Sequence, residues 1–511
     1  MSCSKIFSGD LPELIYEIIK YFQNDYSTLY SCILVNKLWC RLAIPLLWKD
    51  PFSIPTKNYN FIEIYLHNLN DDFKTKLNEY KIINNSLPSN MLFNYSRFLK
   101  YLNINKFIFT TRVWFESSIS KNRLVIDFEN LGDICVSLFE TFIENEVNLH
   151  TLEIEIYYHA CFDNILKLIL KNTNFIYNIR NLNLCIDSLS IYNSDECISS
   201  ISQIINLQQN LKKISLNYYG FPLLQPLLLS KDYNYSNTLN TIIFYGVDFI
   251  KVINNLKKVF ERLNVLESVH IYYCYSLNTS FTQQIINLTK PFKLKSLFIS
   301  ESSNIDESLE ILLQKSGDYL ENFGVNIIES SLKQRLLELI TKYCKNIKFL
   351  DFNHGYEIQI IYQLFNLIKN IKQNLNYLSI NLENSSNGIE YCSIILQKLG
   401  QILPPKLEYL CLNFYYIKVS DLEVFLKNSQ DTFIEKLLIN NSKGQAILPS
   451  IKKYIMNKKR VKYLAIKEPH FLANELISFK GEVNKFRLYN IEVKSYDGLK
   501  INSDNYIKEI D

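Results

Sequence analysis

Aromatic side chains stand at one repeated position in the second half of the chain, and their chemistry is that of a protein-binding surface. They are Phe349, Tyr377, Tyr409 and Tyr463, each two residues after the first member of an apolar-x-x-apolar-x-apolar motif. Exposed aromatic residues at neighbouring positions dominate the binding energy of many protein interfaces. We therefore predict a target-binding stripe at these four residues. The alternative is that these rings only stack between neighbouring strands and stabilise the sheet. Some clustering of aromatic residues is expected in any case, because 14% of all residues are aromatic.

Catalytic and metal-binding patterns are missing from the sequence. It has no G-x-x-x-x-G-K-[ST], G-x-S-x-G or H-E-x-x-H motif, and 12 Gly in 511 residues disfavour phosphate-binding loops. The six His lack the spacing of metal ligands. Glu153 and Glu155 share one predicted strand face, but no second acid-base group pairs with them. We expect no enzyme activity, no catalytic residues, no metal site and no cofactor.

The elements that would position the aromatic stripe are strand-helix repeats. The apolar motif recurs about every 28 residues. It begins at Leu149, Ile179, Leu211, Leu239, Leu266, Leu294, Leu320, Ile347, Leu375, Leu407, Ile434, Val461 and Val483. Stretches of helical periodicity, such as residues 162–170, lie between the motifs. One such unit cannot bury its apolar face alone, whereas stacked units bury a continuous core and pair their strands in parallel.

Residues 99–490 resemble leucine-rich-repeat proteins. The resemblance implies an α/β solenoid with parallel strands on its concave face and helices on its convex face. The Asn or Cys that usually follows the third apolar residue in this family is mostly missing. Tyr157 and Tyr219 stand there in two repeats, and Cys274 stands there in one. The exact curvature is therefore not predicted.

Asparagine recurs at the seventh position of the motif, counted from its first apolar residue. These residues are Asn217, Asn326, Asn353, Asn381, Asn413 and Asn440. Asn ends strands well, and successive Asn side chains can form a hydrogen-bonded ladder, so we interpret the pattern as structural. The alternative is a direct contact with target peptides.

The composition of the chain limits which kinds of partner and which cellular compartment we expect. The 55 basic and 51 acidic residues leave a net charge of only +4, so we expect no nucleic-acid partner. Eleven Cys without a C-x-x-C pair are typical of a reducing compartment, so we expect a cytoplasmic or nuclear protein, or both. No apolar run approaches the ~20 residues of a membrane helix, and Met1–Asp10 lacks the apolar centre of a signal peptide. We expect no membrane partner.

Residues 11–48 predict a small helical bundle. Asp10 and Pro12 suit the cap and the first position of a helix. Apolar residues follow at helical spacing, first at Leu14, Ile15, Ile18 and Ile19 and then at Leu29, Cys32, Ile33 and Val35. A bundle of about 40 residues is too small to be stable by itself, and spare apolar surface favours a partner.

This segment resembles an F-box. The resemblance rests on the Leu11-Pro12 opening, the Ile one helical turn on and the ending Val35-Asn36-x-x-Trp39. Residues 43–51 are similar to F-box proteins of filamentous and mycorrhizal fungi. The resemblance implies docking onto the Skp adaptor, which binds a cullin-RING ubiquitin ligase core. The docking residues that it implies are Leu11, Pro12, Leu14, Ile15, Ile18, Leu29, Cys32, Val35 and Trp39. The alternative is that these residues only pack the bundle, which is our interpretation of Ile19, Ile33 and Leu34.

The resemblances divide the chain into four parts: an F-box at 1–50, a helical linker or cap at 51–98, the repeats at 99–490 and a C-terminal tail at 491–511. Within the cap we predict helices at about 59–68 and 72–80. The repeats begin with a strand at Leu99, Leu102 and Ile104, then a less regular strand at 124–126 and a helix at 131–142.

Together these resemblances imply the substrate-recognition subunit of an SCF-type cullin-RING ubiquitin ligase. The F-box would dock on the Skp adaptor, the repeats would bind an unidentified target protein, and proximity would accelerate ubiquitin transfer. Two alternatives are open. One is a non-catalytic leucine-rich-repeat scaffold or inhibitor whose N-terminal helices cap the solenoid, and the other is an F-box protein that works with the adaptor alone. A receptor leaves Leu11, Pro12 and Trp39 accessible, whereas a cap buries them.

Overall fold

The structure is a computed structural model. It describes residues 11–23, 25–54, 59–66, 69, 74–75, 91–122, 128–156, 161–186, 195–217, 237–251, 253–303, 305–354, 357–382, 388–456, 460–469 and 475–501. The chain forms two compact units. The first comprises Met1–Ile243 with Arg262–Leu266, and the second comprises Phe244–Glu261 with Glu267–Asp511. The predicted repeat region, 99–490, contributes to both units.

The first unit begins with three helices, α2 (Pro12–Lys20), α3 (Tyr26–Ile33) and α4 (Lys37–Leu47). Pro12 stands in the first turn of α2, where its missing N–H costs nothing. The Asp25 side chain caps α3 by accepting a hydrogen bond from the Thr28 N–H at 3.1 Å. Asn36 caps α4 in the same way through the Trp39 N–H at 3.0 Å. The predicted cap Asp10 lies outside the described residues.

The end of α4 leads directly into the sheet of the first unit. The backbone N–H groups of Lys100 and Tyr101 both donate to the Lys49 carbonyl, at 2.9 and 3.1 Å. The N–H groups of His150 and Thr151 donate in the same way to the Lys100 carbonyl, at 2.8 and 3.0 Å. Lys49 therefore takes the place that a preceding strand would have, which ties the three-helix bundle to the first repeat.

The cap region between the bundle and β1 is aromatic. It contains η1 (Pro51–Ser53), α5 (Ile62–Leu66) and η2 (Tyr95–Phe98). The Trp48 ring lies 5.4 Å from that of Tyr65 and 4.5 Å from that of Tyr95, between ring centroids. The predicted helix at 59–68 is present in its middle part as α5, and most of the one at 72–80 lies outside the described residues.

Strands and helices alternate through the rest of the first unit. Its elements are β1 (Tyr101–Asn103), α7 (Ile104–Asn122), α8 (Phe128–Glu144), β2 (Thr151–Ile156), α9 (Phe162–Lys171), η3 (Thr173–Ile176), β3 (Asn181–Ile186), α10 (Asp195–Asn206) and β4 (Lys213–Asn217). β5 (Thr241–Tyr245) spans the boundary between the units. β1 to β4 pair in parallel and in chain order. The predicted strand at 124–126 lies outside the described residues. The predicted helix at 131–142 is present as part of α8.

The second unit repeats the same alternation. Its elements are η6 (Phe249–Lys251), α12 (Ile253–Arg262), β6 (Ser268–Tyr272), α13 (Thr279–Ile286), β7 (Leu294–Ser300), η7 (Glu301–Ser303), α14 (Leu309–Ser316), η8 (Gly317–Tyr319), β8 (Asn322–Asn326), α15 (Ser330–Tyr343), β9 (Phe349–Asn353), α16 (Ile358–Ile371), β10 (Tyr377–Leu382), α17 (Gly388–Ile402), β11 (Lys406–Phe414), α18 (Val419–Asn428), β12 (Phe433–Asn441), α19 (Leu448–Ile455), β13 (Val461–Lys467), η11 (Leu476–Ser478), α20 (Lys480–Arg487), β14 (Glu492–Val493) and α21 (Tyr496–Leu499). Twelve of the predicted motif strands are confirmed within the described residues, as β2 to β13.

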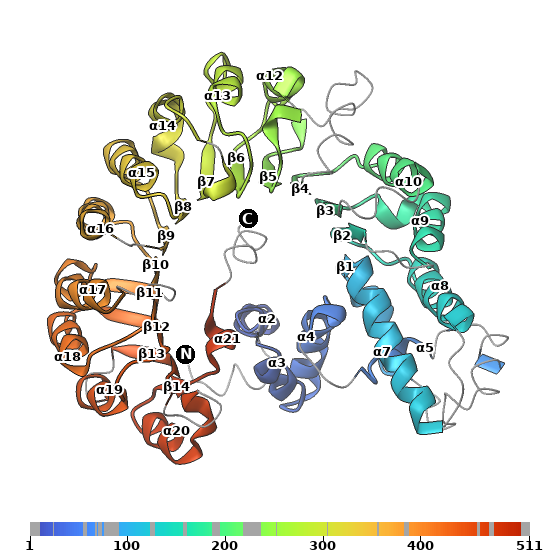
Figure 1. The fold of residues 1–511 in the computed structure, drawn as a ribbon. Helices are drawn as coiled ribbons and strands as arrows, with labels where there is room; N and C mark the ends of the chain where they lie inside the picture. Colours follow the sequence, from blue (N-terminus) through green and yellow to red (C-terminus); the bar gives the residue numbers. More distant parts are fainter. Residues whose placement is uncertain are drawn as a thin grey trace. The chain divides into compact units, whose positions relative to one another are not determined.

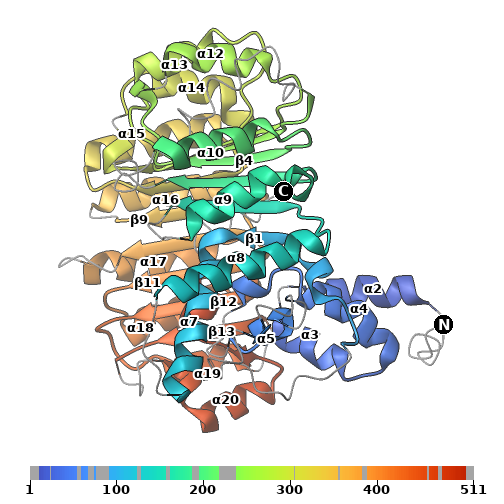
Figure 2. The same cartoon turned by 90° about the vertical axis from the view of Figure 1, so that its right-hand side faces the viewer.

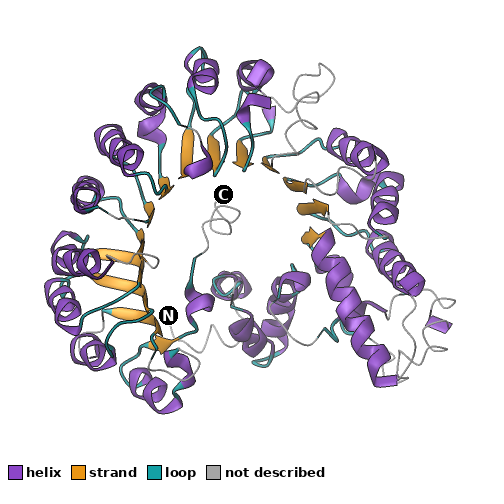
Figure 3. Cartoon of the chain, in the orientation of Figure 1, coloured by secondary structure: helices purple, strands orange, loops and turns teal. Residues whose placement is uncertain are grey.

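Parallel pairing places equivalent motif residues side by side in the second unit, whose strands Figure 2 shows one above the next. The fourth motif residues of β9 to β13 form one buried row: Leu350, Leu378, Leu410, Leu437 and Leu464. A Leu→Ala change in this row should cost about 2–5 kcal/mol. Helices α13 to α19 lie on one side of the strands (Figures 1 and 3). We call the other side, on which none of these seven helices lies, the helix-free face; the short α21 contacts β12 and β13 there.

The last predicted strand is wrong. Val483 and Phe486 lie in helix α20, where Phe486 is buried, and Leu488 just beyond it is 82% exposed. Two apolar residues three positions apart fit one side of a helix as well as they fit the strand motif. The strand comes later, as β14, in the segment that we assigned to a tail. The described part of that segment, 491–501, belongs to the fold of the second unit.

Candidate protein-binding surfaces

The predicted docking residues of the bundle divide into core and surface. Ile15, Leu29 and Cys32 are buried and form the core of the bundle with Ile19 and Ala43. Burial raises the pKa of the Cys32 thiol, and the nearby Asp25 carboxylate adds to the rise. These three residues hold the helices together and present no surface to a partner in this conformation.

The remaining docking residues reach the surface. Leu14 and Val35 are exposed, and Leu11, Pro12, Ile18 and Trp39 are partly exposed. Leu34, which we interpreted as a packing residue, is 72% exposed, so that interpretation is wrong. Ile19 is buried and Ile33 packs partly against the core, as expected for packing residues.

Tyrosines that the sequence analysis missed add to this surface. Tyr21 and Tyr30 are exposed at the end of α2 and within α3. Leu14, Ile18 and Tyr21 follow one another at i, i+4 and i+7, which places them on one side of α2. Helical spacing alone could have found this outer stripe, because the inner stripe runs one residue later, from Ile15 to Ile19.

The aromatic residues of the repeats form a row on the helix-free face. Strand register places Phe349, Tyr377, Tyr409, Lys436 and Tyr463 next to one another. The ring centroids of Phe349 and Tyr377 are 6.0 Å apart, and those of Tyr377 and Tyr409 are 6.4 Å apart. This is the ladder of stacked rings that the alternative interpretation predicts.

The predicted target-binding stripe is only partly exposed. Tyr377 and Tyr463 reach the surface in part, but Phe349 and Tyr409 are both 2% exposed. Tyr409 is covered by the chain itself: its hydroxyl oxygen accepts a hydrogen bond from the Ile501 N–H at 3.2 Å. The expectation that Phe349 and Tyr409 are accessible is therefore wrong in this conformation.

The covering segment is residues 491–501, which we call the C-terminal strap. β14 pairs with β13, and α21 contacts β12 and β13. The Tyr496 ring packs in a cluster with Tyr409, Cys411, Leu438 and Ala465. The Tyr496 hydroxyl lies 3.3 Å from the Cys411 Sγ. Nothing in the local sequence of the strap indicates this packing, because its partners lie up to 92 residues earlier.

The asparagines at position seven form the predicted ladder across β9 to β12. Asn381 Nδ2 donates to Asn353 Oδ1 at 3.0 Å, and Asn413 Nδ2 donates to Asn381 Oδ1 at 3.1 Å. Asn440 Nδ2 continues the series by donating to Asn413 Oδ1 at 2.7 Å. The ladder ends on a carboxylate, because Asn353 Nδ2 donates to Asp351 Oδ2 at 3.1 Å. Asn381, Asn413 and Asn440 thus each donate to the preceding strand, whereas Asn353 donates within β9.

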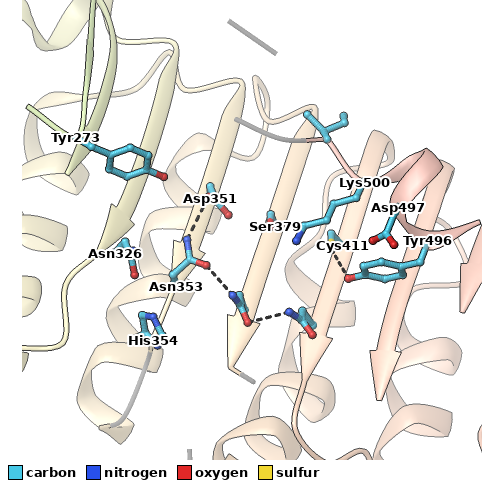
Figure 4. Close-up of a pocket in the computed structure, with 13 residues that line it drawn as sticks. Tyr273, Asn326, Asp351, Asn353, His354, Ser379, Cys411, Tyr496, Asp497 and Lys500 are labelled. Atoms are coloured by element: carbon cyan, nitrogen blue, oxygen red, sulfur yellow. Dashed lines mark hydrogen bonds between the residues drawn. The ribbon is translucent and has the colours of Figure 1, made fainter. Parts of the chain in front are cut away.

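A hollow of about 490 Å³ opens between the amide ladder and the strap. Asp351, Ser379 and Cys411 lie in it, with Tyr273 at one end and Tyr496 and Lys500 at the other (Figure 4). Burial raises the pKa of Asp351, while hydrogen bonds from Ser379 and Asn353 and the positive charge of Lys500 oppose that rise. The hollow therefore combines one carboxylate, several amides and aromatic ends, which suits a polar or cationic group.

A buried lysine supports the edge of the hollow from the helix side. Lys333 of α15 is fully buried, and its Nζ donates to the backbone carbonyls of Asn353 and His354. The Nζ also lies 4.9 Å from the centroid of the Phe352 ring. Burial lowers the pKa of Lys333 to about 7, although Glu301 opposes the fall. His354 has a left-handed backbone conformation, with φ +59°.

Glu153, one of the two carboxylates predicted on β2, acts within the fold. Glu153 is buried and accepts a hydrogen bond from the Tyr101 hydroxyl on the neighbouring strand. Burial, the Glu153 charge and this hydrogen bond raise the pKa of Tyr101. Over the described ranges, no three His, Cys, Asp or Glu side chains are grouped so that they could hold a metal ion. No described helix is both long enough and apolar enough to cross a membrane.

Comparison with known proteins adds no family. No protein-family model matches the chain, and no curated protein matches it. The two surfaces are therefore interpreted from the residues of this chain.

Proposed function

We propose that the chain is the substrate-recognition subunit of an SCF-type cullin-RING ubiquitin ligase. The N-terminal bundle is an F-box that docks on the Skp adaptor, and the leucine-rich repeats bind the target protein. The protein would have no catalytic step of its own and would act by holding the target near the ligase core. We expect it in the cytoplasm, the nucleus or both, with no nucleic-acid or membrane partner.

The observation that carries the proposal is the apolar outer side of the bundle. Leu14, Leu34 and Val35 are 42%, 72% and 50% exposed, although all three are apolar. Exposed apolar side chains on a bundle with so small a core are typical of a docking module. Their apolar area is removed from water only when a partner binds. They include or adjoin residues that the F-box resemblance implies for adaptor contact.

The alternative in which the N-terminal helices only cap a leucine-rich-repeat scaffold is less well supported. A cap would bury Leu11, Pro12 and Trp39 against the first repeat, but these side chains are partly exposed. Other groups make the connections of the bundle: the Trp48 ring contacts Tyr95 of the linker region, and the Lys49 carbonyl accepts hydrogen bonds from the first repeat. The outer side of α2 is therefore left for a partner.

Co-expression with the Skp adaptor of the same organism, followed by size-exclusion chromatography, tests the proposal. We expect a one-to-one complex with the wild type and none with Leu11→Ala/Pro12→Ala. A folded chain that forms no complex in either form would contradict the proposal and favour the scaffold. Target ubiquitination in a reconstituted ligase separates the third alternative, because an adaptor-only protein would form the complex without supporting ubiquitin transfer.

A further inference from the structure

The floor of the hollow is made of the side chains at position five of the motif on β9 to β13, none of which is aromatic. Register places Asp351, Ser379, Cys411, Leu438 and Ala465 next to one another on β9 to β13. Alternate residues of a strand share a face, so positions three, five and seven all lie on the helix-free face. The aromatic row at position three and the amide ladder at position seven therefore flank this floor on its two sides.

Aromatic rings close both ends of the floor. At one end the ring of Phe298 lies above Gly324, where a Cβ would fall on the ring atoms. At the other end the Tyr496 ring of the strap covers Cys411, Leu438 and Ala465. Between the rings, Asp351 and Ser379 stay accessible from the hollow.

The strap presents two side chains to this floor from one helical turn. The Lys500 N–H donates to the Tyr496 carbonyl at 2.8 Å, so the two residues stand four positions apart on the same side of the turn. Tyr496 fills the apolar end of the floor, and Lys500 projects into the hollow with Asp351 (Figure 4). The Lys500 charge stabilises the Asp351 carboxylate, which gives the pair charge complementarity.

The start of the strap is anchored firmly, because β14 pairs with β13 and the side chains of Ile491 and Val493 are buried. The α21 part that covers the floor is held by fewer contacts, since Leu499 and Ile501 pack only partly against the Tyr409 cluster. Lys467 pairs with Asp497 at 3.2 Å, but the Asp497 side chain is 79% exposed, and exposed ion pairs contribute little. α21 is only four residues long, and a helix that short has little stability of its own. Release of α21 from the floor therefore leaves the β13–β14 pairing in place, and a second segment with the same two side chains can take its position.

We propose that this floor is a docking site for a helical segment of a partner protein in which an aromatic residue is followed four positions later by Lys or Arg. The C-terminal strap is an internal competitor that occupies the site until such a segment displaces it. The aromatic residue takes the place of Tyr496 above Cys411, and the basic residue pairs with Asp351. This goes beyond the proposed ligase function and does not depend on adaptor docking.

Fluorescence anisotropy with a labelled synthetic peptide of residues 491–501 tests the proposal on the full-length chain. The protein variant Lys500→Glu keeps the strap residues that pack but places a second carboxylate near Asp351. We expect this variant to bind the peptide about tenfold or more tightly than the wild type, because its site is open for a larger fraction of the time. A peptide carrying Tyr496→Ala should bind at least tenfold more weakly than the unmodified peptide.

A second substitution separates the floor from other surfaces. Ser379→Arg fills the floor, so Lys500→Glu/Ser379→Arg should lose peptide binding. The matched control is Lys500→Glu/Ser199→Arg, since Ser199 is exposed on α10 of the other unit, and its affinity should equal that of Lys500→Glu. Circular dichroism establishes that each variant is folded. Equal peptide affinity of the wild type and Lys500→Glu, or full binding by the Ser379→Arg variant, would overturn the proposal.

Discussion

The ring of Phe298 on β7 occupies the space above Gly324 on β8, which is its register partner. The same ring lies 5.9 Å from that of Phe349 and 6.2 Å from that of Tyr273, between centroids. Tyr273 in turn lies 6.5 Å from Tyr245. The aromatic row of the second unit thus extends beyond the residues at motif position three. It does so because Gly324 leaves room for the ring of Phe298, which stands at motif position five.

Gly324→Ala should destabilise the second unit by about 1–3 kcal/mol, because the new methyl group displaces a buried ring. The three Trp residues, Trp39, Trp48 and Trp114, all belong to the first unit. Urea unfolding followed by far-ultraviolet circular dichroism should therefore show the loss, while the midpoint from Trp emission stays unchanged. Gly132→Ala is the control, since a Cβ there meets nothing within 4 Å and should not destabilise α8.

Asn381→Ala should break the amide ladder at its centre. The change removes one acceptor and one donor, so the amides of Asn413 and Asn353 each lose a hydrogen bond. We expect a cost of about 1–3 kcal/mol, with faster amide hydrogen exchange in β9 to β11. Asn366→Ala, on the exposed side of α16, supplies the comparison and should change neither quantity. Equal stability of both variants would mean that the ladder contributes nothing.

Lys333 should make the stability of the second unit depend on pH. Its pKa is about 7 in the folded chain and near 10.5 in the unfolded chain, so between these values only the unfolded state binds the proton. Stability should therefore rise with pH above about 7, by up to about 1.4 kcal/mol per pH unit. Below about pH 7 both states carry the proton, and the full cost of burying the charge is present.

Lys333→Met isolates this contribution, because it removes the ionisable group and leaves the neighbouring Glu301 and His354 side chains in place. Unfolding midpoints from circular dichroism at pH 6, 7, 8 and 9 should rise more steeply for the wild type than for the variant above pH 7. Parallel pH profiles would show that Lys333 keeps its charge when buried.

Ile15→Ala should unfold the bundle and leave the repeats intact. Ile15 is fully buried in the bundle core, and its truncation should cost about 2–5 kcal/mol. Trp39 packs against the same core, so its emission should move to longer wavelength while the circular dichroism of the repeats changes little. Leu14→Ala, one residue earlier on the exposed side, should leave emission as it is.

The sequence predicts the strands well because their apolar residues pack against equivalent residues one repeat away. Leu378 and Leu410 are one example, since each occupies the fourth motif position and they pair directly. The Val483 motif fails for a physical reason: its apolar spacing is compatible with a helix, and no neighbouring strand selects the extended form. A local sequence pattern predicts the type of secondary structure correctly only where the tertiary contacts favour the same type.

The candidate surfaces are less predictable than the strands. Exposure of Tyr409 depends on Ile501 and Tyr496, which lie 92 and 87 residues later in the chain and carry no motif. Likewise, Leu34 follows an apolar helix and looks like a core residue, but its place at the end of α3 turns it outward. Such features depend on which segments meet in three dimensions, and a single sequence does not encode those meetings as a local pattern.

The affinity of the Skp adaptor for the exposed side of the bundle tests the central claim most directly. Isothermal titration should compare the wild type, Leu34→Glu/Val35→Glu and the control Leu92→Glu, since Leu92 is a leucine of the first unit outside the bundle and is even more exposed than Leu34. The account predicts at least a hundredfold loss, about 2.7 kcal/mol, for the double variant and none for the control. Unchanged affinity in the double variant, or no adaptor binding by the folded wild type, would contradict it.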